Sequence, residues 1–136
     1  NKLNDVVTAQ RENKQLIWGA IESLDGVSPR SVPPNAYDTA DALVFFVPDA
    51  SSAQRCRDFL LADNLGTKIL PEAYSWHFAG TWEHMSELRE RHNGNLMDAF
   101  KHSHKLLSRA VALPISALNM DEALPRRVRA AIEKAI

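Results

Sequence analysis

The stretch ALVFFVP, residues 42–48, constrains the fold more than any other part of the sequence. Six consecutive apolar residues, several of them β-branched or aromatic, come before a proline. Such a run is typical of a strand that is buried on both faces or lies in the centre of its sheet. The other elements therefore have to be arranged around this strand.

Helical spacing of apolar residues is visible in four other segments, residues 1–25, 49–66, 95–109 and 120–136. The first segment is polar at residues 10–15 and apolar at both ends. This pattern suits a rod that joins two packed bodies, and equally a surface helix with a hydrated centre. In the second segment, Ser51 and Gln54 have the spacing of a capping box.

Three short strand patterns accompany these helices, around residues 30–32, 67–71 and 110–115. Strands and helices follow one another without regular βαβ alternation, which indicates an α+β fold. We expect a small, mostly antiparallel sheet of three to four strands, covered by helices on one face.

Composition narrows the classes of partner. The 136 residues carry a formal net charge of -1, so the basic excess of a nucleic-acid-binding domain is missing. No apolar run has the length of a membrane span, and no signal peptide opens the sequence. The single cysteine, Cys56, lies on an apolar helix face and fits a reducing compartment. We expect a cytoplasmic protein with neither nucleic acid nor membrane as partner, and the uncapped first helix suggests a piece of a longer chain.

The sequence has no standard catalytic motif. It contains neither a glycine-rich phosphate loop nor a nucleophile elbow. Of the five histidines, His77 and His84 are seven residues apart, while His102 and His104 are two apart. Neither spacing brings ligands together at one ion on a helix, so we predict no metal site.

The segment YSWHFAGTWEHM, residues 74–85, is unusual because it gathers two tryptophans, two histidines, a tyrosine and a phenylalanine. Aromatic residues in an irregular segment either plug the edge of a domain or form the wall of a pocket. The pattern alone favours the plug. Lys68 before the segment and Arg109 after it could supply positive charge, although most such side chains are simply exposed.

Three longer strings carry a resemblance to a known family: NKLNDVVTAQRENKQLIWGAIESLDGV, CRDFLLADNLGTKILPEAYSWHF and HSHKLLSRAVALPISALNMDEALPRRVRAAIEKAI. Together they resemble the C-terminal region of the DegT/DnrJ/EryC1/StrS family, which are pyridoxal-phosphate-dependent sugar aminotransferases. The loop WHFAGTWEHM is most similar to the 8-amino-3,8-dideoxy-manno-octulosonate aminotransferases, which aminate the terminal carbon of an octulosonate sugar.

The resemblance implies a division of the chain. Residues 1–25 would be the long interdomain helix, and residues 26–136 the small C-terminal α+β domain of an enzyme with the aspartate aminotransferase fold (fold type I). The aldimine lysine and the phosphate cup would belong to an N-terminal large domain absent from this chain. We therefore expect no catalytic residue here, no pyridoxal phosphate bound by this chain alone and no activity of this fragment alone. The parent would be a homodimer.

The same resemblance implies that the aromatic segment walls a substrate pocket. The parent would transfer an amino group from glutamate to a keto or aldehyde sugar, such as an 8-oxo octulosonate. The expected substrate-binding residues are Tyr74, Ser75, Trp76, His77, Trp82, His84 and Arg109. The alternative hypothesis is a free-standing, non-enzymatic α+β domain that binds a ligand or another protein.

Overall fold

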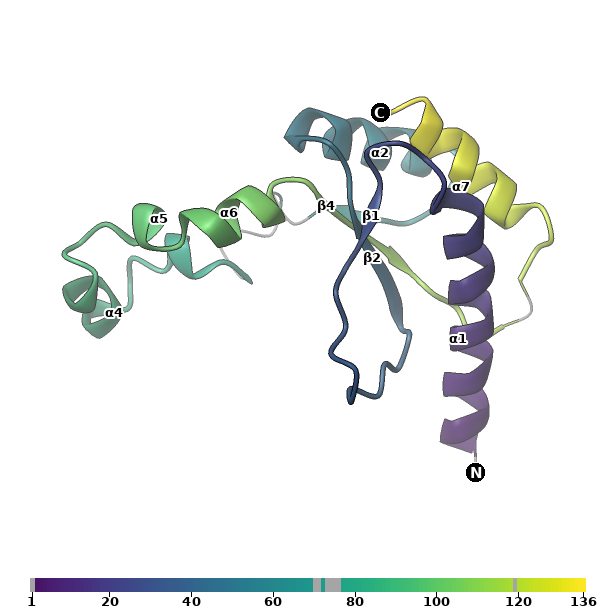
Figure 1. The fold of residues 1–136 in the computed structure, drawn as a ribbon, viewed down its shortest axis with the longest axis horizontal. Coiled ribbons are helices and arrows are strands. Elements are labelled where there is room, and N and C mark those ends of the chain that lie inside the picture. Colours follow the sequence, from purple (N-terminus) through teal and green to yellow (C-terminus); the bar gives the residue numbers. More distant parts are fainter. Residues whose placement is uncertain (1, 70–71, 73–76, 119) are drawn as a thin grey trace.

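The computed structural model describes residues 2–69, 72, 77–118 and 120–136. In these residues six α-helices accompany one four-stranded antiparallel sheet (Figure 1). The predicted α+β class is therefore confirmed. Among the described helices, none combines the length and the apolar character needed to cross a membrane.

The sheet contains strands β1 (Ser28–Pro29), β2 (Ala42–Phe46), β3 (Lys68–Ile69) and β4 (Ala110–Pro114). Their order across the sheet is β1-β2-β4-β3, and each neighbouring pair is antiparallel. The strand predicted to be central, β2, indeed lies between β1 and β4.

The two faces of the sheet differ in burial. Leu43 and Phe45 are buried on one face of β2, whereas Val44 and Phe46 are half-buried on the other. The alternation follows from the period of two along a strand. We call these the covered face and the open face. On β4, Leu113 and Val111 lie opposite Leu43 and Phe45, and so belong to the covered face. Ala112 and Ala110 lie opposite Val44 and Phe46, and so belong to the open face.

Helices α1 (Lys2–Ile21), α2 (Ala50–Ala62) and α7 (Leu124–Glu133) form one core with the sheet. Their fully buried side chains include Ile21, Cys56, Leu60, Val128 and Ile132, together with Phe45 and Val111 of the strands. Helix α7 has proline in its first turn, where the missing N–H costs no hydrogen bond.

Residues 77–108 form what we call the arm, which projects away from the sheet between β3 and β4 (Figure 1). The arm contains the 3-10 turn η2 (Ala79–Thr81) and helices α4 (Ser86–Arg91), α5 (Leu96–Ala99) and α6 (Lys101–Leu107). Phe78 and Leu96 are buried inside it, at 2% and 0% exposure, and are separate from the main core.

Three local predictions were wrong. The edge strand expected at residues 30–32 lies at Ser28–Pro29, because these two residues pair with Phe46 and Phe45. Helix α2 is capped by Asp49 rather than Ser51, since the Asp49 carboxylate accepts the Ser52 amide at 2.7 Å. The helix expected over residues 95–109 is divided at Phe100 into α5 and α6.

The polar centre of α1 binds two loops. Gln10 Nε2 donates to the Ile115 carbonyl at 3.0 Å, and Asn13 Nδ2 donates to the Ser116 carbonyl at 2.8 Å. On another side of the helix, Arg11 Nε donates to the Asp38 carbonyl at 2.7 Å. The polar centre of α1 is therefore not simply exposed to water. Its side chains donate hydrogen bonds to loop carbonyl groups that have no partner in the sheet.

Candidate functional site

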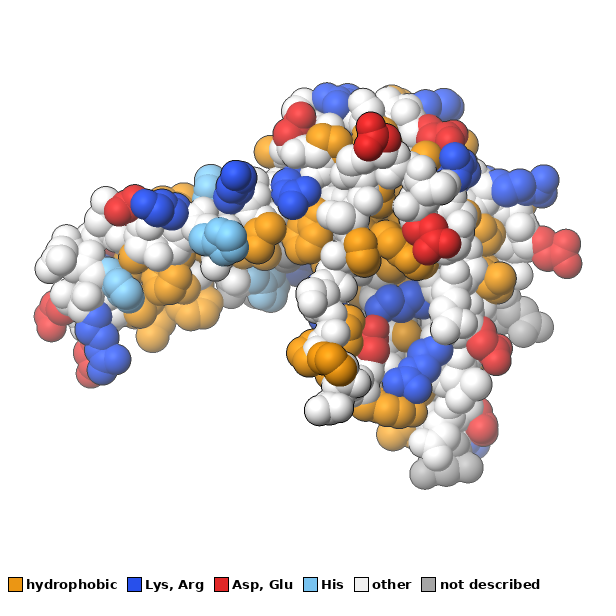
Figure 2. All heavy atoms as spheres, viewed as in Figure 1, with side chains coloured by type: hydrophobic (Ala, Val, Ile, Leu, Met, Phe, Trp, Pro, Cys, Tyr) orange, Lys and Arg blue, Asp and Glu red, His pale blue; other side chains and the backbone are white. Residues whose placement is uncertain are grey.

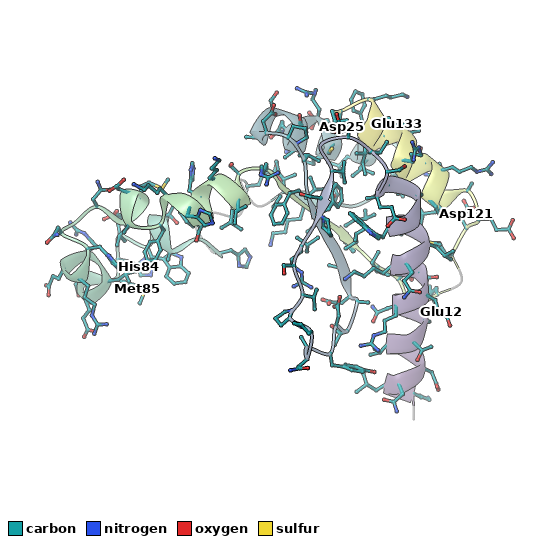
Figure 3. The ribbon with its side chains drawn as sticks, viewed as in Figure 1. Glu12, Asp25, His84, Met85, Asp121 and Glu133 are labelled. Atoms are coloured by element: carbon teal, nitrogen blue, oxygen red, sulfur yellow. The ribbon has the colours of Figure 1, made fainter. Side chains whose placement is uncertain are left out.

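The structure describes four of the seven residues expected to bind substrate. Tyr74, Ser75 and Trp76 lie outside the described residues, whereas His77, Trp82, His84 and Arg109 lie within them. These four do not form a single cluster. His77 and Arg109 lie where the arm joins the sheet, and Figure 3 shows His84 far out on the arm.

His77 and Lys68 are paired at the base of the arm. Lys68 Nζ lies 2.9 Å from His77 Nε2. A lysine ammonium has only donors, so in this contact Lys68 is the donor and His77 Nε2 the acceptor. Lys68 pairs in register with Ala112, which belongs to the open face. The pair therefore lies at the open face of the sheet.

Arg109 also lies over the open face. Its guanidinium carbon is 5.3 Å from the ring centroid of Phe46, a residue of that face. Nη1 donates to the Val47 carbonyl at 3.0 Å, and the Val47 amide donates to the Arg109 carbonyl at 3.0 Å. Arg109 thus extends the β2–β4 ladder by one residue pair. It has this structural role whether or not it also binds a ligand.

The open face has a defined chemistry. Its centre is formed by half-buried apolar side chains, Val44, Phe46 and Ala112. Lys68 with His77 lies at one border, and Arg109 covers Phe46. An apolar floor with cationic groups at its border suits a ligand that has both a ring or carbon chain and an anionic group.

Trp82 and His84 form a second part of the predicted site. Trp82 is half-buried next to η2, where its amide donates to the Ala79 carbonyl at 3.2 Å. His84 and Met85 are exposed on the arm, and Figure 3 shows both far from Glu12 of α1. Trp82 can therefore offer a ring face only to a molecule that approaches the arm itself.

Part of the aromatic segment is a plug, as the pattern alone suggested. Phe78 is buried in the arm and its ring lies 5.8 Å from the ring of His104, centroid to centroid. The Phe78 carbonyl accepts both the amide of Thr81 at 3.1 Å and its hydroxyl at 2.8 Å. These contacts hold the turn that presents Trp82.

The described lysines do not fit a pyridoxal phosphate site on their own. Five of the six, Lys2, Lys68, Lys101, Lys105 and Lys134, are exposed. The half-buried Lys14 is ion-paired with Asp38 at 2.5 Å. A Schiff-base lysine needs a desolvated site and a cup for the cofactor phosphate beside it. We therefore assign no step of cofactor chemistry to this chain. Among the described residues, no cluster of three or more metal-ligating side chains occurs.

Three residues that were not expected from the sequence meet between α1 and the segment before β2: Arg11, Lys14 and Asp38. Arg11 and Lys14 are three residues apart in the polar centre of α1, and so share one helix face. That spacing was the available signal. The position of Asp38 opposite them depends on the path of an irregular segment, which periodicity does not predict.

Comparison with models of known protein families gives no match. Two solved structures have a similar fold. One is 3-amino-5-hydroxybenzoic acid (AHBA) synthase, with a TM-score of 0.63 and 16% identity over 98% of this chain and 35% of the other. The second is Spr1654 from Streptococcus pneumoniae, assigned as a sugar aminotransferase and solved in its PMP form. It has a TM-score of 0.68 and 9% identity over 96% of this chain and 32% of the other. The chain thus spans about a third of the length of either protein.

Proposed function

We propose that this chain is the part of a pyridoxal-phosphate-dependent sugar aminotransferase that walls the substrate pocket. The observation that carries the proposal is the likeness in fold to AHBA synthase and to an assigned sugar aminotransferase, which extends over 98% and 96% of this chain. At sequence identities of 16% and 9%, the likeness shows a similar fold but not a shared activity. The step from fold to activity rests on the sequence resemblance to the DegT/DnrJ/EryC1/StrS aminotransferases.

In this proposal, residues 1–25 are the interdomain helix and residues 26–136 the small domain. The cofactor, which serves as electron sink for amino transfer, is held by a large domain outside this chain. Glutamate is the proposed amino donor, and an 8-oxo octulosonate the proposed acceptor. The parent is proposed to act as a homodimer in the cytoplasm.

The open face and the base of the arm receive the sugar. Lys68, His77 and Arg109 offer hydrogen-bond donors and positive charge to the carboxylate of a sugar acid, over the floor formed by Val44 and Phe46. Trp82 and His84 lie out on the arm, so they are proposed to contact only a part of the substrate that extends along the arm, where Trp82 offers a ring face. Tyr74, Ser75 and Trp76 complete the proposed wall.

A trapping experiment tests whether the cofactor is held outside this chain. The 136-residue chain is mixed with pyridoxal phosphate and reduced with borohydride, and the lysines are then located by peptide mass spectrometry. We expect only scattered, substoichiometric labelling of exposed lysines. Stoichiometric labelling of one lysine would contradict the proposal, because it would mean that this chain holds the cofactor by itself.

A pair of histidine variants tests the wall. In the aminotransferase that contains this chain, His77→Gln is expected to raise the KM for the sugar roughly tenfold, about 1.4 kcal/mol, with a smaller effect on kcat. The control is His102→Gln, an exposed histidine of α6. Equal kinetics for the two variants would remove His77 from the site. A gene product without any transaminase activity would favour the alternative, a non-enzymatic binding domain.

A further inference from the structure

We propose that the pocket between α1 and residues 36–40 binds a small organic carboxylate, at the end of the sheet opposite the arm. Arg11, Lys14, Gln15 and Trp18 of α1 line one side, and Asp38 and Ala40 line the other. Its volume is about 370 Å³. Small-molecule sites begin at roughly 300 Å³, so the pocket accommodates a metabolite of a few carbon atoms.

Arg11 is held in one orientation by two contacts. Its Nε donates to the Asp38 carbonyl at 2.7 Å, and its guanidinium carbon lies 3.8 Å from the ring centroid of Tyr37. The contact with the ring limits the movement of the guanidinium on one side, and the bond from Nε limits its rotation. Among the described residues, the two terminal nitrogens have no hydrogen-bond partner and remain a parallel pair of donors, the arrangement that binds a carboxylate through both oxygens.

Asp38 already has two cationic neighbours. Its Oδ2 is 2.5 Å from Lys14 Nζ, and its Oδ1 is 3.8 Å from Arg30 Nη2. In the described part of the chain, Arg11 forms no ion pair with a carboxylate. Arg11, Lys14 and Asp38 give the pocket one net positive charge. A singly charged carboxylate compensates this charge, whereas a phosphate dianion would bring one uncompensated negative charge next to Asp38.

The backbone on the far side of the pocket is strained. Ala40 has a φ of 61°, although it is not glycine, and its side chain is 1% exposed. The Ala40 amide donates to Asp38 Oδ1 at 3.0 Å, which helps to hold this conformation. Left-handed backbone at a non-glycine residue costs of order 1 kcal/mol and occurs often at ligand sites.

The pocket is separate from the proposed sugar wall. The segment that contains Asp38 enters β2 at Ala42, which pairs with Pro114, whereas the arm joins the sheet at the other end, near Ile69 and Ala110. Figure 2 shows Lys or Arg and Asp or Glu side chains gathered in the hollow between the segment before β2 and α1. The inference therefore does not depend on the aminotransferase proposal.

Titration by NMR tests this inference on the whole chain. Sodium succinate monomethyl ester is the carboxylate probe, inorganic phosphate is the comparison, and sodium chloride keeps the ionic strength constant. We expect saturable shifts of the Arg11 Nε–H and the Trp18 indole N–H, with phosphate at least tenfold weaker. Arg11→Lys keeps the charge but removes the pair of donors, and is expected to weaken binding at least tenfold.

A matched variant and a second pocket variant complete the test. Arg57→Lys changes an arginine that pairs with Asp58 on α2 and is expected to leave binding unchanged. Tyr37→Leu removes the stacking surface and is expected to weaken binding several-fold, which provides an answer even if Arg11→Lys does not fold. Shifts that do not saturate, equal affinity of Arg11→Lys and Arg57→Lys, or tighter binding of phosphate would each overturn the proposal.

Discussion

Gly80 lies so close to Phe78 that a Cβ atom at residue 80 would be 2.3 Å from Cε1 and 2.4 Å from Cζ of the Phe78 ring. It would also be 3.2 Å from the sulfur of Met97. The methionine is flexible, but the ring is buried in the arm and has no room to move aside. The glycine in the aromatic segment is thus required by packing, because only hydrogen fits against the ring.

Gly80→Ala should therefore destabilise the arm. We expect a loss of about 1–3 kcal/mol of folding free energy, the usual cost of overpacking a core, measured by urea denaturation. Amide resonances of residues 77–108 should shift more than those of the sheet. Gly66→Ala is the control, because a Cβ atom there meets nothing within 4 Å. Equal stability of the two variants would show that the arm is looser than described.

The N-cap of α2 can be tested by two neighbouring substitutions. Asp49 accepts the Ser52 amide at 2.7 Å, whereas the Ser51 hydroxyl only accepts from Arg55 Nη1, at 2.7 Å and in an exposed position. Asp49→Ala should lower the midpoint of thermal unfolding more than Ser51→Ala does, because it leaves a helix N–H without a partner. A larger effect of Ser51→Ala would restore the capping box that the sequence suggested.

The sequence predicts an element best where a single local pattern determines its structure. The run at residues 42–48 has the apolar continuity of a central strand, and β2 is central because both of its edges are paired. In α7, Pro125 lies in the first turn, the one place in a helix where proline removes no hydrogen bond. In these cases local chemistry and tertiary packing require the same structure.

The sequence predicted less where the structure depends on contacts between distant residues. Ser51 with Gln54 matches a capping box, but the chain reaches the helix with Asp49 in the extended conformation that an N-cap needs. The pocket beside α1 combines Arg11 with Asp38, 27 residues apart, through a segment without periodicity. The aromatic segment proved to be partly core, at Phe78, and its described members His77, Trp82 and His84 do not form one cluster.

The ion pair between Lys14 and Asp38 should make stability depend on pH. The hydrogen bond from Lys14 holds the pKa of Asp38 below its ordinary value of 3.8, with help from the Ala40 amide and against the effect of burial. Because the folded-state pKa is the lower one, the contribution is present above pH 3.8 and disappears as the pH falls through the folded-state value. Asp38→Asn should therefore be less stable than the parent chain at pH 6, by about 1 kcal/mol.

Urea denaturation at pH 6 and at pH 2.5 measures this dependence. The difference between Asp38→Asn and the parent chain should shrink at the lower pH, because Asp38 takes up its proton near pH 3.8 in the unfolded state and only at a lower pH in the folded state. Asp25→Asn, at an exposed residue after α1, serves as the control for the loss of one negative charge. A stability difference that stays constant between the two pH values would show that Asp38 acts through packing rather than charge.

Cys56 should resist thiol reagents until the chain unfolds. Its side chain is 0% exposed in the core, and burial raises the pKa of the thiol to about 11 from 9.0. At pH 8 this lowers the thiolate fraction roughly 100-fold, and the reagent also has no access to the sulfur. Labelling with a disulfide reagent should therefore proceed at the rate of opening and become fast in urea. The matched control combines Cys56→Ala with Ala62→Cys, which moves the thiol to an exposed position of α2. That variant should be labelled at once in the native state, and equally rapid labelling of the parent chain would mean that α2 is not packed on the sheet as the structure has it.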